Sequence, residues 1–495
     1  MLNNIMSFLP KYFNKSNIVV IIFLSILVYF FYLAPTNLSQ FLLNDNNTAV
    51  YSVYSRSLLE FSYDKTKFLM SEVGPDGKNV FYNEETDKIN RYINHPPLLV
   101  WLTALSFKYL GTDIINGRLI SILSSSLFLL IFFNFLIYLK KSLKILFSSI
   151  FLLLSMPIFW THGLVIEHQP LLNLLLLISS VFLLKIEDDR SRRLIVYFIL
   201  FWSLALLTDW IAYFFLIPFS IYLIKIKRFK LLPIILIYPF IVYVLINLYH
   251  QFAIDDLTLK NILGIDTFFY RTGVNLFPET NFFSNWASSI LKMIYLFVFF
   301  NFKILISLIF FMGLIFITLK FSEIDNKLKY LFLFFFVPTT IYMLVFRMWA
   351  ESHSYWSYYY ITPILVSFIL LLDHQKKFFA NLIIFLVLIN FIFNFNKVSR
   401  DIISYKNNPL SLSVNKFLKK YKDYDYVSDD PSIGYGFGFR SRWLENKKFF
   451  NVVNYKFDNK KVLYIRRLSN CDLDQIKVQK FEFYNWCYSE QNFLK

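Results

Sequence analysis

The sequence lacks the glycine-rich loops that hold nucleotide phosphates. Neither GxxxxGKS, GxxxxGKT nor GxGxxG occurs among the 495 residues, so nothing in the chain indicates nucleotide binding. Charged residues are scarce, at 17% of the chain, and no repeat with a period of about 20–50 residues is visible. With so few charges and 57% hydrophobic residues, the chain does not have the composition of an ordinary soluble domain.

Cysteine is also scarce. The only two, Cys471 and Cys487, both lie in the C-terminal tail. If the tail is outside the cell, the two thiols can pair, because that compartment is oxidising. The alternative is a pair of free thiols, and the sequence leaves both open.

Long apolar runs are what the chain has instead. Runs of about 18 residues or more predict transmembrane helices. The first, at 17–35, is too long for the core of a signal peptide and no small-residue cleavage site follows it, so we expect a retained span. We expect eleven spans, at 17–35, 114–139, 145–160, 171–186, 194–208, 211–224, 231–250, 303–319, 328–346, 358–372 and 378–395.

The distribution of Lys and Arg predicts the orientation. The net charge of +17 suggests nucleic-acid binding at first, but many of the basic residues stand in short clusters between apolar runs. With the N-terminus in the cytoplasm, every cluster between spans falls on the cytoplasmic side, as the positive-inside rule requires. Two long loops, 36–113 and 251–287, then lie outside. A full crossing at 284–300 would invert everything after it, so we expect an interfacial or broken helix there.

The parts outside the membrane have a predicted structure of their own. Segments 48–61 and 96–111 are short for a span and carry aromatic residues, which indicates helices lying at the membrane interface. Pro96-Pro97 suit a helix start. We therefore expect a polytopic α-helical domain over 1–396 in the plasma (or inner) membrane. A small α/β domain over 397–495 is expected outside it, with a helix at 415–421 and strands at 424–430, 434–443 and 460–467.

Several polar residues fall near the predicted outer boundary. Asp45 has two interpretations, a helix cap or a general base toward an acceptor hydroxyl. Glu167 and its neighbour His168 are either solvated loop residues or part of a site. Asp209 stands where a span leaves the bilayer, where a carboxylate is costly, and it either reaches to the boundary or belongs to a site.

Three other candidates also fall on predicted outer loops. They are His95, Arg271 and His353. His95 is either a surface imidazole or a group that holds a phosphate or a metal. Each of these candidates is a weak signal alone, and their shared side of the membrane indicates a site.

Short motifs follow one another along these loops. Asp45 opens a helix that contains Ser55-Arg56, and then come His95-Pro96-Pro97, Gly111 and Arg118. The motifs read DNNTA (45–49), HPPL (95–98), EHQP (167–170), DW (209–210) and HSYW (353–356). In layout and motifs the chain resembles the membrane glycosyltransferases of the GT-C superfamily. That group includes protein O-mannosyltransferases (glycosyltransferase family 39) and lipid A aminoarabinose transferases (ArnT). The resemblance covers about residues 17–375.

The resemblance implies a sugar donor linked to polyprenyl (undecaprenyl or dolichyl) phosphate and an inverting transfer on the outer face. The acceptor is a lipid, a glycan or a protein. The resemblance assigns the role of base to Asp45 and contacts with donor phosphate to Arg56, His95 and Arg271. The substrate-binding positions are Glu167, Asp209, His353 and Tyr355. No cofactor is implied with certainty, and a divalent metal stays open.

The sequence also departs from the family pattern. An ungapped alignment on Ser55-Arg56 and Tyr51 places Asn47, not Asp45, at the family's Asp position. Asn46 and Asn94 stand where relatives have acids. Two alternatives therefore stay open: a transporter or lipid flippase, and a non-catalytic scaffold that binds glycolipid. A transporter is expected to place ionisable residues near the bilayer midplane, which distinguishes it from the enzyme.

Overall fold

The structure is a computed structural model that describes residues 15–34, 45–73, 81–82, 91–93, 95–189, 191–254, 258, 282–350, 354–406, 420, 424–428, 449–451, 461–467 and 486–492. The chain divides into two compact units. The larger unit comprises Met1–Leu33 and Ser121–Asp401, and the smaller comprises Ala34–Ile120 and Ile402–Lys495. The predicted division into 1–396 and 397–495 stays a prediction.

The larger unit is helical, and each predicted span falls on a helix or a bent helix pair. Its elements are α2 (Lys15–Leu33), α6 (Ile114–Tyr138, which begins in the smaller unit), α7 (Leu143–Leu154), α8 (Pro157–Gly163), α9 (His168–Lys185), α10 (Arg192–Leu206), α11 (Ile211–Phe214), α12 (Leu216–Lys225), η1 (Phe229–Leu231), α13 (Leu232–Ala253), α16 (Phe282–Tyr295), η2 (Leu296–Asn301), α17 (Lys303–Leu319), α18 (Asn326–Val345), α19 (Arg347–Ala350), η3 (Ser354–Tyr360), α20 (Ile361–His374) and α21 (Lys377–Lys406).

The predicted fold class, a polytopic helical membrane protein, is confirmed. In the described part of the chain, six helices are long and apolar enough to cross a membrane, or up to eight if each of two bent pairs is one span. The predicted eleven also include the shorter helices α2, α10 and α11–α12.

The two bent pairs have different breaks. The axis turns by 66° between α7 and α8, where Pro157 starts the new helix, because proline cannot donate the hydrogen bond that would continue the old one. Between the segments 287–299 and 303–319 the turn is 112°, after the π-helical stretch η2. Segment 284–300 therefore does not run straight into α17, in line with the prediction of a broken helix.

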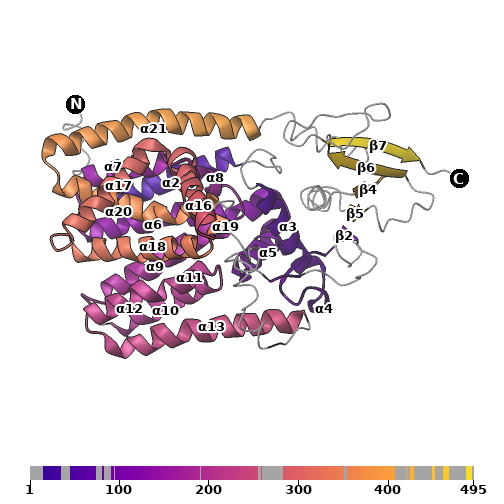
Figure 1. Cartoon of the computed structure of the whole chain (residues 1–495), viewed down its shortest axis with the longest axis horizontal. Helices are drawn as coiled ribbons and strands as arrows, with labels where there is room; N and C mark the ends of the chain where they lie inside the picture. The colour runs from indigo at the N-terminus through magenta and orange to yellow at the C-terminus, as the bar shows by residue number, and fades with distance from the viewer. Residues whose placement is uncertain are drawn as a thin grey trace. The chain divides into compact units, whose positions relative to one another are not determined.

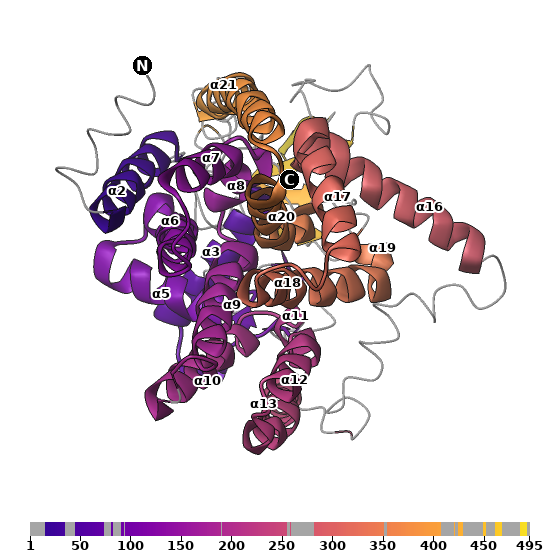
Figure 2. The ribbon, with the colours of Figure 1, turned by 90° about the vertical axis from the view of Figure 1, so that its left-hand side faces the viewer.

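Burial separates inner helices from outer ones. In the most apolar 18 residues of each segment, 94% are buried in Tyr355–His374, 22% in Phe229–Ala253 and only 11% in Lys377–Ile403. The two exposed helices, α13 and α21, lie on opposite sides of the larger unit (Figures 1 and 2). Many of their exposed side chains are large and apolar, such as Phe240, Phe385 and Phe393, which suits lipid contact. The centre of the larger unit is thus built on η3 and α20.

Basic loops meet at one end of the larger unit. Lys141 Nζ lies 2.5 Å from the Asp373 carboxylate, which links the loop after α6 to the end of α20. Lys327 donates hydrogen bonds to the Asp188 carboxylate and to the Tyr138 hydroxyl. These contacts join the start of α18, the loop after α9 and the end of α6. These predicted cytoplasmic loops share one end, as the predicted topology requires.

In the smaller unit, two helices stand where interfacial helices were predicted. They are α3 (Asp45–Glu60) and α5 (Leu98–Leu110), with Pro97 as the cap residue before α5. The Ser55 hydroxyl lies within hydrogen-bond distance of two backbone carbonyls, Tyr51 O on α3 at 2.7 Å and Val100 O on α5 at 3.2 Å. The short helix α4 (Tyr63–Thr66) and the pair β1 (Met70–Ser71) and β3 (Arg91–Tyr92) complete this part.

A five-stranded sheet completes the smaller unit. Its order is β2–β5–β4–β6–β7, with β2 at Phe81–Tyr82, β4 at Asp425–Ser428, β5 at Phe449–Asn451, β6 at Lys461–Arg467 and β7 at Trp486–Asn492. All neighbours pair in parallel except β6 and β7. Strands β4 and β6 were predicted, and β2, β5 and β7 were not. Strand β2 comes from the first long loop, so that loop and the tail share one sheet. The predicted strand 434–443, most of the predicted helix 415–421, and Cys471 lie outside the described residues.

Candidate functional site

The first part of the candidate site is a buried acid–imidazole pair at the junction of α8 and α9. Glu167 Oε2 lies 2.6 Å from His162 Nδ1. Glu167 occupies the position before α9, where a negative charge is favourable because it faces the helix N-terminus. Glu167 and His168 are 1% and 2% exposed, so the interpretation of these two as solvated loop residues is wrong.

The second part is Asp209, between α10 and α11. Its Oδ1 accepts a hydrogen bond of 2.6 Å from the backbone N–H of Trp210, and its Oδ2 lies 3.4 Å from the Tyr359 hydroxyl. The side chain is 1% exposed and therefore does not reach to solvent. Burying a carboxylate is costly unless such partners satisfy it.

The tyrosine-rich element η3 contacts Asp209 directly and Glu167 through His162. A 3₁₀-helix has about three residues per turn, so residues three apart share a face. Tyr355 and Tyr358 form one face and lie with ring centroids 5.9 and 6.3 Å from that of His162. The Tyr358 hydroxyl is also 3.1 Å from Ser125 Oγ on α6.

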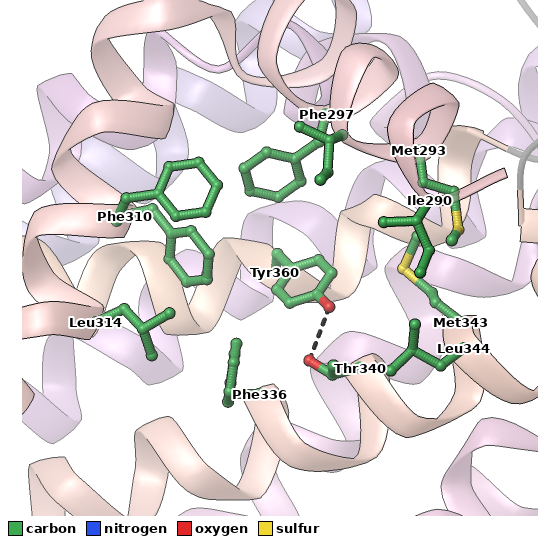
Figure 3. Close-up of a pocket in the computed structure, with 12 residues that line it drawn as sticks. Ile290, Met293, Phe297, Phe310, Leu314, Phe336, Thr340, Met343, Leu344 and Tyr360 are labelled. Atoms are coloured by element: carbon green, nitrogen blue, oxygen red, sulfur yellow. Dashed lines mark hydrogen bonds between the residues drawn. The ribbon is translucent and has the colours of Figure 1, made fainter. Parts of the chain in front are cut away.

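The second face of η3 is formed by Trp356 and Tyr359. The Trp356 ring centroid lies 4.7 Å from that of Tyr342 on α18, and Tyr359 reaches Asp209. The third face carries Tyr360, whose hydroxyl lies 2.9 Å from Thr340 Oγ1 (Figure 3). One short helix thus contacts the Glu167 pair, Asp209 and the region around Tyr360.

The region around Tyr360 is an apolar pocket of about 220 Å³ between α16, η2, α17 and α18. Rings dominate the lining: the Tyr360 ring centroid lies 5.4 Å from that of Phe297 and 5.8 Å from that of Phe310, as Figure 3 shows. Met293 and Met343 line the pocket too. Its two polar side chains, Thr340 and Tyr360, are hydrogen-bonded to each other. The rest of the lining is apolar, so the pocket suits a hydrocarbon ligand.

In α9 and α18 of the larger unit, the Lys and His side chains keep to the helix ends. In α9 these are His168 and Lys185, the first and last residues. In α18 they are Lys327 and Lys329 within the first turn. Glu167 and Asp209 lie at the end of the unit opposite to the basic loops, because α9 and α12 each lead from one of them to the lysines at 185 and 225.

The smaller unit holds the first-loop candidates. His95 stacks on Tyr92, with ring centroids 5.8 Å apart, and Tyr92 stacks on Tyr54 of α3 at 6.0 Å. Arg56 forms an ion pair with Glu60 one turn further along α3. This arrangement holds the imidazole in front of the first turn of α5.

The remaining sequence candidates are not described. Asp45 begins α3, but its side chain is outside the described part, as are Arg271 and His353. The predicted gathering of Asp45, His95 and Arg271 therefore stays a prediction. The structure does bring together Glu167 and Tyr355, both around His162.

Sequence reasoning missed His162, Tyr358 and Tyr359. A local signal was present for His162, because it precedes Glu167 by five residues across a helix break. No local signal marked Ser125 as the partner of Tyr358, since 233 residues separate them. Among the described residues, no group of three or more His, Cys, Asp or Glu side chains is placed to hold a metal ion.

Comparison with known proteins gives matches to solved structures alone. No family model matches the chain, and no curated protein matches it. The crystal structure of ArnT from Cupriavidus metallidurans in the apo state is similar over 96% of this chain and 98% of that one, at 10% identity and a TM-score of 0.47. The same protein bound to undecaprenyl phosphate gives 95% and 97% coverage, 10% identity and a TM-score of 0.46. ArnT is one of the transferases that the motifs resemble, but likenesses with TM-scores below 0.5 assign neither family nor activity to this chain.

Proposed function

We propose that this chain is an integral-membrane glycosyltransferase that moves a sugar from a polyprenyl-phosphate carrier to an acceptor on the outer face of the membrane. One observation carries the proposal. A tyrosine-rich helix contacts the buried carboxylate of Asp209 directly and the buried carboxylate of Glu167 through His162, and its next face lines an apolar pocket, at the end of the helices opposite to the basic loops. A substrate with a polar head and a hydrocarbon tail needs such a neighbourhood.

The proposed chemistry is an inverting displacement at the anomeric carbon. The acceptor oxygen forms a bond to that carbon while the bond from the carbon to the phosphate oxygen breaks. Asp45 takes the acceptor proton, and the electron pair leaves on the polyprenyl phosphate. Arg56, His95 and Arg271 are the proposed cationic or hydrogen-bonding partners of that phosphate, since groups that stabilise developing charge lower the barrier most.

Glu167, Asp209, His353 and Tyr355 are the proposed contacts for the sugar or the acceptor. Carboxylate oxygens accept hydrogen bonds from sugar hydroxyls, and aromatic rings pack against the apolar face of a sugar. Tyr355 is only half-buried, whereas Glu167 is fully buried. In this proposal the substrate meets Tyr355 first, and Glu167 both contacts the substrate and orients His162.

The positions of charge support an enzyme over a transporter. A transporter places ionisable groups and broken helices near the bilayer midplane. In the helices described here, the ionisable groups of α9 and α18 stand at their ends. A scaffold that binds glycolipid without catalysis differs from the enzyme in one respect: its function should survive Asp45→Asn.

The decisive experiment uses the full chain in lipid nanodiscs. Undecaprenyl phosphate carrying a radiolabelled hexose or pentose is supplied with membrane lipids and envelope glycans as acceptors. The expected result is release of undecaprenyl phosphate with transfer of label by the wild type and not by Asp45→Asn. In cells, deletion of the gene should alter the profile of glycolipids or glycoproteins. Unchanged profiles together with altered uptake of a solute would reject the enzyme in favour of the transporter.

The orientation is part of the proposal. We place the N-terminus in the cytoplasm and the C-terminal region outside, because the basic loops gather at one end of the larger unit. Alkaline phosphatase, which requires export for activity, should be active when fused after Lys495 and inactive when fused into the loop at 140–144. The reverse pattern would overturn the orientation.

A further inference from the structure

Three consecutive tyrosines of η3 point in three directions. Tyr358 contacts the His162 ring, Tyr359 contacts Asp209, and Tyr360 lines the apolar pocket. Tyr358 and Tyr359 are buried to within 1% of full burial, and Tyr360 is 9% exposed. The three rings thus contact three different parts of the larger unit: His162 of α8, Asp209 between α10 and α11, and the pocket beside α18.

The conformation of η3 is unusual in length. It holds seven residues in 3₁₀ geometry and continues directly into α20. Runs of more than about three or four residues in this geometry are uncommon, because side chains three apart eclipse and the hydrogen-bond geometry is poorer than in an α-helix. The seven residues of η3 are therefore a segment with an accessible alternative, the α-helix that α20 already provides.

We propose that η3 is a relay that couples an isoprenoid chain in the apolar pocket to the positions of Glu167 and Asp209, with Tyr360 as the residue that determines which carrier chains support transfer. The inference rests on the proposed function and adds to it a determinant of donor specificity. Nothing in the proposed chemistry requires such a link. It follows from the three faces of one helix.

Helix geometry gives the relay its size. Successive residues turn by about 120° in a 3₁₀-helix and by about 100° in an α-helix. Conversion of η3 to α geometry would thus rotate Tyr355 relative to Tyr360 by about 100°, which is about 20° for each of the five steps from one residue to the other. A chain that displaces Tyr360 would in this way redirect the ring that faces His162.

The pocket indicates the chemical class of the ligand. Thr340 and Tyr360 satisfy each other, so the walls offer only rings, thioethers and alkyl groups. An apolar cavity of about 150 Å³ holds a benzene molecule. The 220 Å³ here therefore takes on the order of two isoprene units. Methionine and aromatic rings adapt well to an irregular, unsaturated chain.

The kinetic test compares two donors with the same sugar in nanodiscs. One donor carries undecaprenyl phosphate, and the other carries a phosphate with a single five-carbon tail that leaves the pocket unfilled. We expect the wild type to turn over the long donor with a kcat about 10-fold higher. Tyr360→Ala and Thr340→Val should each bring that kcat ratio close to one. The matched control is Tyr238→Phe. It removes the 2.8 Å hydrogen bond between the Tyr238 hydroxyl and Ser203 Oγ, and both residues are far from η3 in the sequence.

Two kinetic outcomes would overturn the relay. If Tyr360→Ala lowers kcat equally for both donors, the residue is structural. If it changes only KM for the long donor, the pocket binds the chain without transmitting anything. If the wild type transfers sugar from neither donor, the proposed function is rejected. The relay is then tested by a measurement that does not depend on sugar transfer.

That measurement is the fluorescence of Trp356, which lies on η3 against Tyr342. The probe is geranylgeraniol, an isoprenoid alcohol without phosphate or sugar, and the signal of Trp356 is the difference between the wild type and Trp356→Phe. We expect a saturable change on adding the probe, retained in Tyr238→Phe and lost in Tyr360→Ala. Saturation of the pocket by the probe without any change at Trp356 would contradict the relay.

Discussion

His162 Nδ1 lies 2.6 Å from Glu167 Oε2, and both side chains are sealed from solvent. The two residues stand five positions apart, on either side of the break between α8 and α9. Their contact therefore fixes the direction in which α9 leaves α8. It also presents the imidazole ring to Tyr355 and Tyr358 of η3.

This contact predicts a specific loss of stability. His162→Ala removes the group that faces Glu167 in a site without solvent, and leaving a buried acceptor without that bond costs about 1–3 kcal/mol of the free energy of unfolding, more if it is charged. Thermal unfolding in nanodiscs should show the loss. The double variant with Glu167→Leu should be less destabilised than the sum of the single changes, because it removes the buried acceptor together with its donor.

The control for this prediction is an exposed ion pair. Glu323 lies 2.7 Å from Lys320, and both side chains are about half exposed. Exposed ion pairs contribute little to the free energy of unfolding, about 0–1 kcal/mol. Glu323→Gln should leave the unfolding temperature unchanged. Equal shifts for His162→Ala and Glu323→Gln would show that the buried pair has no special weight.

The proposed base gives a second prediction. Asp45→Asn keeps the size of the side chain and removes its basicity, so kcat for transfer should fall by about 10²-fold or more while the KM for the lipid donor stays similar. Asn47→Ala is the matched variant, since Asn47 lies two positions further along α3 and is the other position that the family alignment allows. The rate of release of polyprenyl phosphate measures both. If Asn47→Ala lowers kcat more than Asp45→Asn does, the catalytic position is residue 47 and not residue 45.

The membrane helices were predictable because their signal is local. The bounds of an apolar run such as 114–139 can be read directly from the sequence, and α6 (Ile114–Tyr138) matches that run almost to the residue. The start of α5 after Pro96-Pro97 was predictable for the same reason, since proline acts on its immediate neighbours. Basic clusters likewise predicted which loops share one end.

The site was predictable only where a polar residue stood out against an apolar run. Glu167 and Asp209 did so, but their partners depend on contacts between distant segments. Tyr359 reaches Asp209 across 150 residues of sequence. Strands β2 and β5 were not predicted for a similar reason, because each is two or three residues long and is defined by pairing with a distant segment.

The stack of His95 on Tyr92 leads to a third prediction. If His95 faces the donor phosphate, His95→Gln should raise the KM for the lipid donor about 10-fold or more, because the charge-assisted bond is lost. His95→Lys should restore most of the affinity, since a lysine ammonium also donates a charge-assisted hydrogen bond to phosphate. Donor titration of the transfer rate measures both changes. Full activity of His95→Gln would assign the imidazole to packing on Tyr92 alone.

The approach of α17 to α20 supplies the fourth prediction. A Cβ added at Gly313 would overlap the side chain of Ser367 and lie 2.9 Å from its Cα, closer than real contacts allow. Gly313→Ala should therefore push the two helices apart and lower the free energy of unfolding by about 1–3 kcal/mol. Ser367→Gly in the same chain should recover part of the loss, because it removes the overlapping Cβ. Ile315→Ala is the control on the same helix, with a side chain 59% exposed to the surroundings. Thermal unfolding of the four proteins in nanodiscs checks the order, and a Gly313→Ala protein as stable as Ile315→Ala would show that α17 and α20 are not held at this distance.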